Sequence, residues 1–184
     1  QAAGPRVGPL AVHPAKVQHR GVKVEQLVGR TLGGRYLVHC LIGQVGMGAV
    51  YEAEDTLLAK RVALKVLSAD LVPVREHLAR FVREARAAAS IGHPSIVEIY
   101  DSGIEGQDLP FFAMELLQGC SLAAELRERG RLSVARSIDI ACQSLAALGA
   151  AHKVGVVHRD LKPANIVLCF ETGSSPTGGA RAPC

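Results

Sequence analysis

The chain of 184 residues has no tryptophan, and only 4% of its residues are aromatic. Aliphatic side chains must therefore fill the core, and a hydrophobic content of 48% supplies enough of them. The sequence also lacks an apolar run of about 18 residues, so it predicts no membrane-spanning segment. At the N-terminus, prolines and charges occupy the place where a secretory signal needs an apolar stretch.

Cysteine pairs are absent as well. The five cysteines are odd in number, lie far apart and include no Cys-x-x-Cys pair: Cys40, Cys120, Cys142, Cys169 and Cys184. This spacing argues against a disulfide framework or a zinc site and fits a reducing compartment. We therefore expect a cytoplasmic protein.

Negative charge is scarce in residues 1–35, where six basic residues stand against Glu25 alone. The net charge of +4 therefore belongs to this arm and not to a folded face, which argues against a nucleic-acid partner. Weak contact of the arm with an acidic partner or a membrane surface stays an alternative. As far as about Gly29, glycines and prolines interrupt any helical or alternating pattern of apolar residues. Residues 1–35 are therefore predicted to form a flexible basic arm.

Polar chemistry is concentrated in the eight residues from His158 to Asn165. They contain Asp160, then Lys162 two places later and Asn165 five places later, between the apolar runs 156–157 and 166–168. The pattern predicts a polar loop between two short strands. A carboxylate can orient a hydroxyl, an ammonium can contact a moving phosphate and an amide oxygen can bind Mg²⁺, so the spacing suits phosphoryl transfer. A charged surface turn is the alternative.

A glycine-rich segment lies between two strand candidates, residues 36–42 and 51–53. Its glycines would let backbone N–H groups close over phosphates, although several glycines in a hairpin are a weak signal alone. The strand-like run 62–65 follows, and strand alternation points Lys65 inward. An ordinary lysine whose head group reaches solvent is the alternative.

The sequence predicts helices in three places. Residues 74–90 place Leu78, Phe81, Ala85 and Ala88 on one apolar face, with Glu84 beside it. Ser121 is a predicted N-cap of a short helix that Gly130 ends. Ser133 is a predicted N-cap of a helix to about His152, with a buried face of Val134, Ile138, Ala141, Leu145 and Leu148. Residues 96–100 and 111–116 are further strand candidates.

In this order the motifs resemble those of protein kinases. Residues 158–165 resemble the catalytic loop, and Lys162 is typical of the serine/threonine branch. Residues 43–50 resemble the glycine loop G-x-G-x-x-G-x-V, except that Val45 stands at the second glycine position, and residues 62–65 resemble V-A-I-K. Residues 46–53 are most similar to bacterial serine/threonine kinases. The resemblance implies an α+β fold, with a complete N-lobe of antiparallel sheet plus one helix (36–116) and a partial helical C-lobe (117–170).

The resemblance also implies roles for single residues. Asp160 would orient the substrate hydroxyl or act as base, Lys162 would contact the γ-phosphate, and Asn165 would bind Mg²⁺. Glu84 would pair with Lys65, with Glu76 a weaker candidate and a solvated glutamate the alternative. The implied ATP-binding set is Ile42, Gly43, Gln44, Val45, Gly46, Met47, Gly48, Val50, Ala63, Lys65, Glu84, Met114, Glu115, Leu117 and Val167. The implied partners are ATP with Mg²⁺ and a protein substrate that offers Ser or Thr.

The resemblance stops near Phe170. Residues 171–184 form a low-complexity polar tail, and neither Asp-Phe-Gly nor Ala-Pro-Glu follows the loop. Because the Asp of the first motif normally holds Mg²⁺, we expect the implied serine/threonine kinase activity to be impaired in this chain. A frameshift or assembly break between about Leu168 and Gly173 is our explanation for the abrupt change. A non-catalytic module that binds nucleotide or a partner, or a fragment without function, is the alternative.

Overall fold

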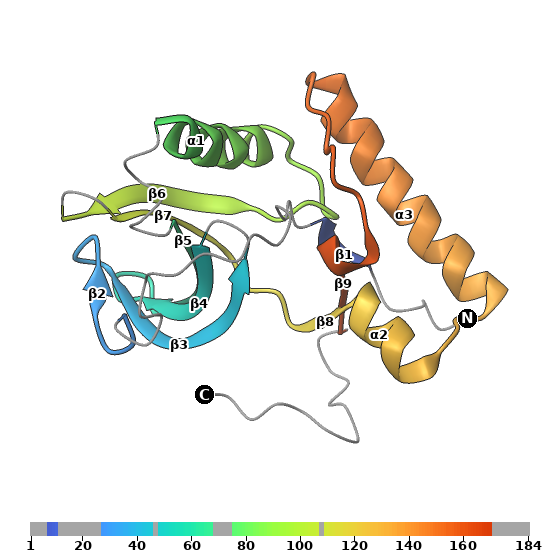
Figure 1. Ribbon diagram of the computed structural model, residues 1–184, viewed down its shortest axis with the longest axis horizontal. Coiled ribbons are helices and arrows are strands. Elements are labelled where there is room, and N and C mark those ends of the chain that lie inside the picture. The colour runs from blue at the N-terminus through green and yellow to red at the C-terminus, as the bar shows by residue number, and fades with distance from the viewer. Residues whose placement is uncertain (1–6, 11–26, 46–47, 68–74, 107–108, 171–184) are drawn as a thin grey trace.

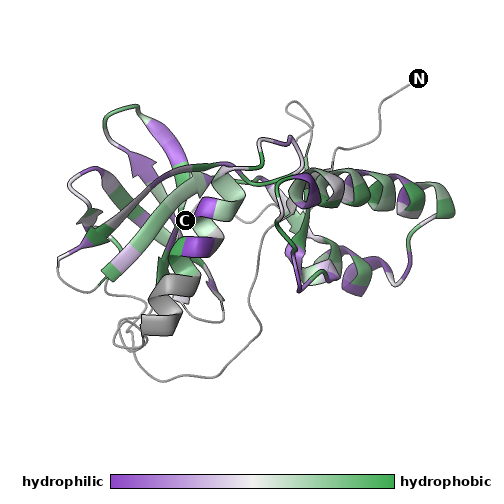
Figure 2. Ribbon diagram, turned by 90° about the horizontal axis from the view of Figure 1, so that it is seen from above, coloured by the Kyte–Doolittle hydropathy of each residue, from purple (hydrophilic) through white to green (hydrophobic). Residues whose placement is uncertain are grey.

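A computed structural model describes residues 7–10, 27–45, 48–67, 75–106 and 109–170, without the side chains of 7–10, 45, 75–80 and 84. Two lobes are connected through residues 116–118 (Figures 1 and 2). The expected α+β fold, with an antiparallel sheet and one helix in the first lobe and helices in the second, is confirmed. No helix in the described part of the chain is long and apolar enough to cross a membrane.

The N-lobe is an antiparallel sheet with strand order β2-β3-β4-β5-β7-β6, accompanied by helix α1. The bounds are β2 Thr31–Leu32, β3 Tyr36–Val45, β4 Gly48–Asp55, β5 Lys60–Leu67, α1 Arg75–Ala89, β6 Ile99–Glu105 and β7 Leu109–Glu115. Burial alternates strictly along β4, which turns Tyr51 and Ala53 into the core. Tyr51 and Leu64 are among the largest fully buried side chains, and the burial of Leu64 stabilises the lobe by about 1.5–3 kcal/mol.

The C-lobe part contains two capped helices and a small sheet. Its elements are β8 Gly119–Ser121, α2 Leu122–Arg129, α3 Val134–Lys153, a 3₁₀ turn Pro163–Asn165 and β9 Ile166–Cys169. The predicted N-caps are confirmed: the hydroxyl of Ser121 accepts from the amide of Ala124 at 3.1 Å, and that of Ser133 accepts from Arg136 at 3.2 Å. Gly130 ends α2 with φ of 74°, a conformation that glycine adopts without strain.

The buried face of α3 differs from the prediction. Four residues of the predicted face are exposed: Val134, Ile138, Ala141 and Leu145. The buried side chains of α3 are Ile140, Ser144, Ala147 and Ala151, and Leu148 is the member of the predicted face that packs, partly buried, against the core. Both sets follow helical spacing, so periodicity alone could not choose between them. The small residues of the buried set allow close packing, and Ser144 made that face look polar in the sequence.

Two expected strands also differ. Residues 156–157 form no strand, although the apolar run suggested one. The strand expected at 96–100 lies at Ile99–Glu105, because Ile96 turns into the C-lobe core instead of joining the sheet.

The N-terminal arm is not devoid of structure. Residues Val7–Leu10 form strand β1, which pairs with β9, and Thr31–Leu32 pair with β3. Leu27 is buried in the N-lobe core. The folded part therefore starts before residue 36, within the segment that the sequence predicted to be a flexible basic arm.

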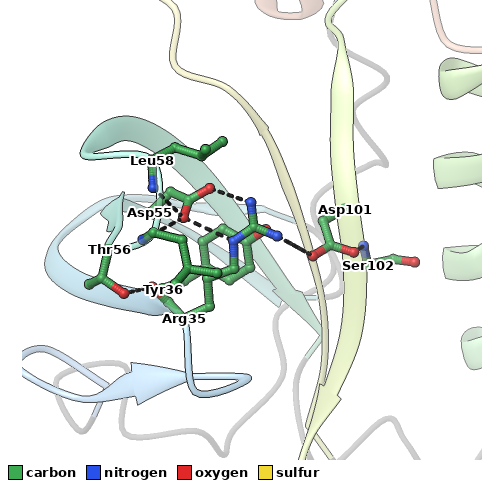
Figure 3. Close-up of polar contacts among 8 residues, drawn as sticks. Arg35, Tyr36, Asp55, Thr56, Leu58, Asp101 and Ser102 are labelled. Atoms are coloured by element: carbon green, nitrogen blue, oxygen red, sulfur yellow. Dashed lines mark hydrogen bonds and ion pairs between the residues drawn. The ribbon is translucent and has the colours of Figure 1, made fainter.

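A polar cluster ties the edges of the N-lobe sheet together (Figure 3). The guanidinium of Arg35 donates to both carboxylate oxygens of Asp55, at 2.9 Å and 2.6 Å, and lies 3.5 Å from Asp101. Asp55 is buried and also accepts from the amides of Leu57 and Leu58. The hydrogen bond from Arg35 is the largest cause that lowers the pKa of the Asp55 carboxyl.

This cluster predicts acid sensitivity. Because the folded-state pKa of Asp55 is lowered, its stabilisation is present above the unfolded value of about 3.9 and is lost as pH falls through the folded value. When the thermal unfolding midpoint is measured from pH 7 downward, it should decrease as the pH drops below about 3.9 and through the folded-state pKa of Asp55. Asp55→Asn should lower the midpoint at pH 7 and flatten the acid slope, whereas Asp101→Asn, at an exposed partner, should change the slope little. Equal slopes for Asp55→Asn and the unmodified chain would contradict this assignment.

Candidate active site

A cavity of about 340 Å³ is lined by residues of both lobes. The lining residues are Ile42, Gly43, Gln44, Val50, Ala63, Lys65, Ala88, Val97, Ile99, Phe112, Met114, Glu115, Leu116, Leu117, Gly119, Ser121 and Val167. Most are apolar, and the charged members of this set are Lys65 and Glu115. An apolar cavity with few polar groups is typical of a small-molecule site.

Ten residues of the predicted ATP-binding set lie on this cavity: Ile42, Gly43, Gln44, Val50, Ala63, Lys65, Met114, Glu115, Leu117 and Val167. Gly46 and Met47 lie outside the described residues, as do the side chains of Val45 and Glu84. The pairing of Glu84 with Lys65 therefore stays a prediction.

Gly48 is placed differently from the rest of the set. It is not on the cavity lining, and a Cβ atom added to it would lie less than 3.0 Å from the carbonyl oxygen of Val66 in the next strand. Real Cβ atoms essentially never come that close, so the hairpin needs glycine here for the approach of β4 to β5.

Lys65 brings a cation into the apolar part of the cavity. Strand alternation turns it inward, where its side chain is buried, and its ammonium lies 5.4 Å from the ring centroid of Phe112. Phe112 is directly opposite Lys65 in the β5–β7 register. A buried ammonium in a low-dielectric wall attracts an anionic ligand strongly.

Sequence reasoning missed the inner wall of the cavity, which consists of Ala88, Val97, Ile99 and Phe112. Alternation could have found Phe112, because it stands two residues before Met114 on the same face of β7. Ala88 and Val97 come from different elements and carry no local signal of a site.

At the end of β7, just before the connection between the lobes, the amide of Glu115 donates to the carbonyl of Glu98 at 2.9 Å. An adenine contact at this residue must therefore use its carbonyl group, while Leu117 also lines the cavity.

The catalytic-loop candidates lie close together. The ammonium of Lys162 is 2.8 Å from Asp160 Oδ2, and Nδ2 of Asn165 donates to the same oxygen at 3.2 Å. Nδ2 also donates to the backbone carbonyl of Asp160 at 2.7 Å, while the amide of Asp160 donates to Nδ1 of His158 at 3.3 Å. Arg159 has φ of 62°, a strained value for a non-glycine residue that recurs at functional loops.

The electrostatics keep Asp160 ionised. The hydrogen bond from Lys162 is the largest cause that lowers the pKa of the Asp160 carboxyl, and the hydrogen bond from Asn165 adds to it. At neutral pH the carboxylate therefore accepts hydrogen bonds and does not donate them.

Asn165 connects the loop to the cavity. Its side chain is completely buried, and β9 starts at the next residue, so Val167 reaches the cavity two residues later. Because Nδ2 is committed to Asp160, the carboxamide oxygen is the group of Asn165 that suits Mg²⁺, which prefers oxygen ligands and keeps several waters. The described residues contain no group of three or more His, Cys, Asp and Glu side chains suited to a metal.

Comparison with known proteins agrees with this geometry. The family described as "Protein kinase domain" matches residues 36–174. A probable serine/threonine-protein kinase of Streptomyces coelicolor is 43% identical over 142 residues, which are 76% of this chain and 21% of the relative. The serine/threonine-protein kinase PknA of Mycobacterium tuberculosis is 41% identical over 155 residues, or 82% of this chain and 35% of the relative.

A solved structure is similar as well. The crystal structure of the Mycobacterium tuberculosis PknI kinase domain has a TM-score of 0.67 and 34% identity, and the match covers 77% of this chain and 57% of that one. The chain spans roughly a fifth to a third of the length of these curated relatives. The cavity with its buried lysine, the ionised loop carboxylate and the match over residues 36–174 lead to one conclusion: this chain belongs to the protein kinase family.

Proposed function

We propose that this chain is the nucleotide-binding and catalytic-loop part of a protein serine/threonine kinase, which transfers the γ-phosphoryl group of ATP to Ser or Thr of a protein. The observation that carries the proposal is the continuity between the two sites. The cavity with Lys65 shares Val167 with the strand that starts directly after Asn165. The short segment 165–167 would therefore fix the position of the loop relative to the bound nucleotide. This matters because positioning of the reactants supplies much of the rate enhancement in phosphoryl transfer.

The cavity would bind ATP at both ends of the nucleotide, the adenine ring and the phosphates. Val50 and Ala63 on the sheet, with Val167 from β9, offer apolar surface to the adenine ring. Lys65 offers a buried positive charge to the phosphates, and an ion pair in such a site is stronger than one in water.

The loop would act on the substrate hydroxyl. Ionised Asp160 can accept the hydroxyl hydrogen and aim the oxygen at the γ-phosphorus, and Lys162 beside it can stabilise the negative charge of the transferred group. Asn165 fixes Asp160 through two hydrogen bonds and presents its oxygen to a metal. Bound Mg²⁺ would supply charge neutralisation at the phosphates.

We place this reaction in the cytoplasm, where ATP is available and unpaired thiols persist. Cys120, Cys142 and Cys169 form no disulfide in the part of the chain that the structure describes, which supports this location.

Nucleotide binding tests the proposal with two lysines of the same strand. Lys65→Ala should weaken ATP binding at least about tenfold in a calorimetric titration, because it removes the buried cation on the cavity. Lys60→Ala is the matched control: Lys60 lies at the exposed end of β5, with its ammonium 3.9 Å from the ring centroid of Tyr100 and away from the cavity lining. Equal losses for both variants, or none for Lys65→Ala, would contradict the proposed site.

The Mg²⁺ dependence of ATP binding, measured in the same titration, distinguishes an incomplete kinase domain from a fully active kinase. In the 184-residue chain, Mg²⁺ should strengthen ATP binding little, because Asp-Phe-Gly is not in this sequence. Phosphate transfer to a generic basic protein should stay at background for the same reason. Strong Mg²⁺ dependence, or transfer that Asp160→Asn abolishes, would show that the chain is active as it stands. Transfer that Asp160→Asn leaves unchanged would contradict the proposed role of Asp160.

A further inference from the structure

Strand β8 follows directly after the connection between the lobes and pairs antiparallel with β9. In this pairing Ser121 is opposite Val167, and both residues line the cavity. Helix α2 starts at the next residue, Leu122, and contacts the 3₁₀ turn that ends at Asn165. The β8–β9 pairing therefore joins two walls of the cavity and lies next to the catalytic-loop candidates.

Gly119, the first residue of β8, lies in backbone contact with β9. A Cβ atom added to it would lie less than 3.0 Å from both atoms of the Leu168 carbonyl group and 3.0 Å from the Cα atom of Cys169. All three are backbone atoms of β9, so none of them can turn aside as the end of a flexible side chain can. Glycine has only a hydrogen atom on this side, and the two backbones can therefore approach each other closely.

The backbone conformation of Gly119 does not explain why glycine is needed. Its φ lies outside the positive region that favours glycine. The close approach to β9 is therefore the feature that excludes a side chain. The pairing is held beside this contact, because the amide of Phe170 donates to the carbonyl of Gln118 at 2.9 Å.

We propose that Gly119 is a positioning residue for the catalytic loop and acts through β9. Its lack of a side chain lets β8 approach the β9 backbone, which sets the distance between Ser121 and Val167 at the cavity. Asn165 stands directly before β9, and its Nδ2 donates to Asp160 Oδ2 at 3.2 Å. A displacement of β9 would therefore also move this donor away from the carboxylate. The role rests on the proposed function, in which loop and cavity serve one bound nucleotide.

Gly119→Ala tests the contact without any nucleotide. The added methyl group should push β9 away from β8, so hydrogen exchange of the Phe170 amide, which bonds to the residue before β8, should become at least about tenfold faster. The amides of β4 and β5 in the N-lobe should keep their protection. Gly149→Ala in α3 is the matched control, because a Cβ there meets no atom within 4 Å, and the exchange of Phe170 should stay unchanged.

The titration of Asp160 separates positioning from a simple loss of stability. The hydrogen bond from Lys162 is the largest cause that lowers the pKa of the Asp160 carboxyl, and the hydrogen bond from Asn165 adds to it. If β9 carries Asn165 away, the pKa of Asp160 should rise in folded Gly119→Ala, measured by an NMR titration of the side-chain carboxyl carbon. Gly149→Ala should leave this pKa unchanged, and so would a variant that is less stable but keeps β9 in place.

Each outcome of these two experiments decides on the proposal. If β9 keeps its protection in Gly119→Ala, the contact does not hold the strand and the inference is wrong. If protection is lost across both lobes, Gly119 serves the folding of the whole chain and the positioning role is rejected as well. If β9 loses protection but the pKa of Asp160 does not change, Gly119 supports the strand alone and does not position the loop.

ATP affinity shows whether the contact matters for the proposed function. Gly119→Ala should bind ATP at least about tenfold more weakly than the unmodified chain in a calorimetric titration, and Gly149→Ala should bind it equally well. Equal affinity for Gly119→Ala and the unmodified chain would overturn the effect on the cavity. Because Gly119 also lines the cavity, the pKa of Asp160 and not the affinity establishes the positioning role. If the unmodified chain binds no ATP, the proposed function fails, while exchange and titration still test the contact.

Discussion

Gly48→Ala is expected to destabilise the N-lobe by about 3 kcal/mol or more and to abolish nucleotide binding. The added Cβ would meet the Val66 carbonyl of the neighbouring strand, and a backbone atom cannot move aside without a break in the β4–β5 pairing. Because Val50 and Lys65 are opposite each other in that pairing and both line the cavity, the site should be lost with it. Chemical denaturation and an ATP titration measure the two effects.

Gly43→Ala is the matched control from the same hairpin. A Cβ at Gly43 meets no atom within 4 Å, and the residue lies outside the positive-φ region, so the chain should fold with unchanged stability. Gly43 lines the cavity, and a modest loss of nucleotide affinity is expected there. If Gly48→Ala folds as well as Gly43→Ala, the close approach of β4 to β5 is not what requires glycine.

Self-association through the outer face of α3 is the second large effect. Ile138 is 57% exposed and Leu145 is 66% exposed, and Val134 extends the same apolar face. In Figure 2, hydrophobic residues (green) alternate with hydrophilic ones along this helix. An apolar patch of this kind promotes association, so the 184-residue chain should form oligomers in sedimentation experiments at micromolar concentration. Ile138→Lys combined with Leu145→Lys should weaken the association at least about tenfold.

Two isoleucines of α3, one buried and one exposed, test which face of the helix packs against the core. Ile140 is only 4% exposed, so Ile140→Ala should lower the free energy of unfolding by about 2–5 kcal/mol, whereas Ile138→Ala should leave it nearly unchanged. A monodisperse, unmodified monomer with a sharp thermal transition would contradict the association, and equal stability losses for the two alanine variants would contradict the assigned faces.

Local signals in the sequence were sufficient for much of the fold. Capping by Ser121 and Ser133 depends on side chains and amides three residues apart, so the helix starts could be predicted. The inward direction of Lys65 follows from strand alternation. The contacts among Asp160, Lys162 and Asn165 also lie within six residues, which is why their spacing indicated the chemistry.

Features that depend on distant partners could not be predicted. Both faces of α3 are apolar, and only the packed C-lobe core decides which one is buried. The requirement for Gly48 comes from a carbonyl in another strand, although the sequence suggested phosphate binding. Strand β1 contains glycine and proline, which usually mark loops, and becomes a strand only because β9 offers it an edge.

The pairing of the N-terminal strand β1 with β9 has a consequence for the order of folding. Closing a loop of about 160 residues between β1 and β9 carries a large entropic cost. Once the N-lobe has folded, Leu27 is fixed in its core, and only the segment 11–26 remains between that anchor and β1. The tenfold shorter loop lowers the closure cost by about 2 kcal/mol. Strand β1 should therefore pair with β9 after the N-lobe forms, so the small sheet of the C-lobe depends for one of its three strands on the folded N-lobe.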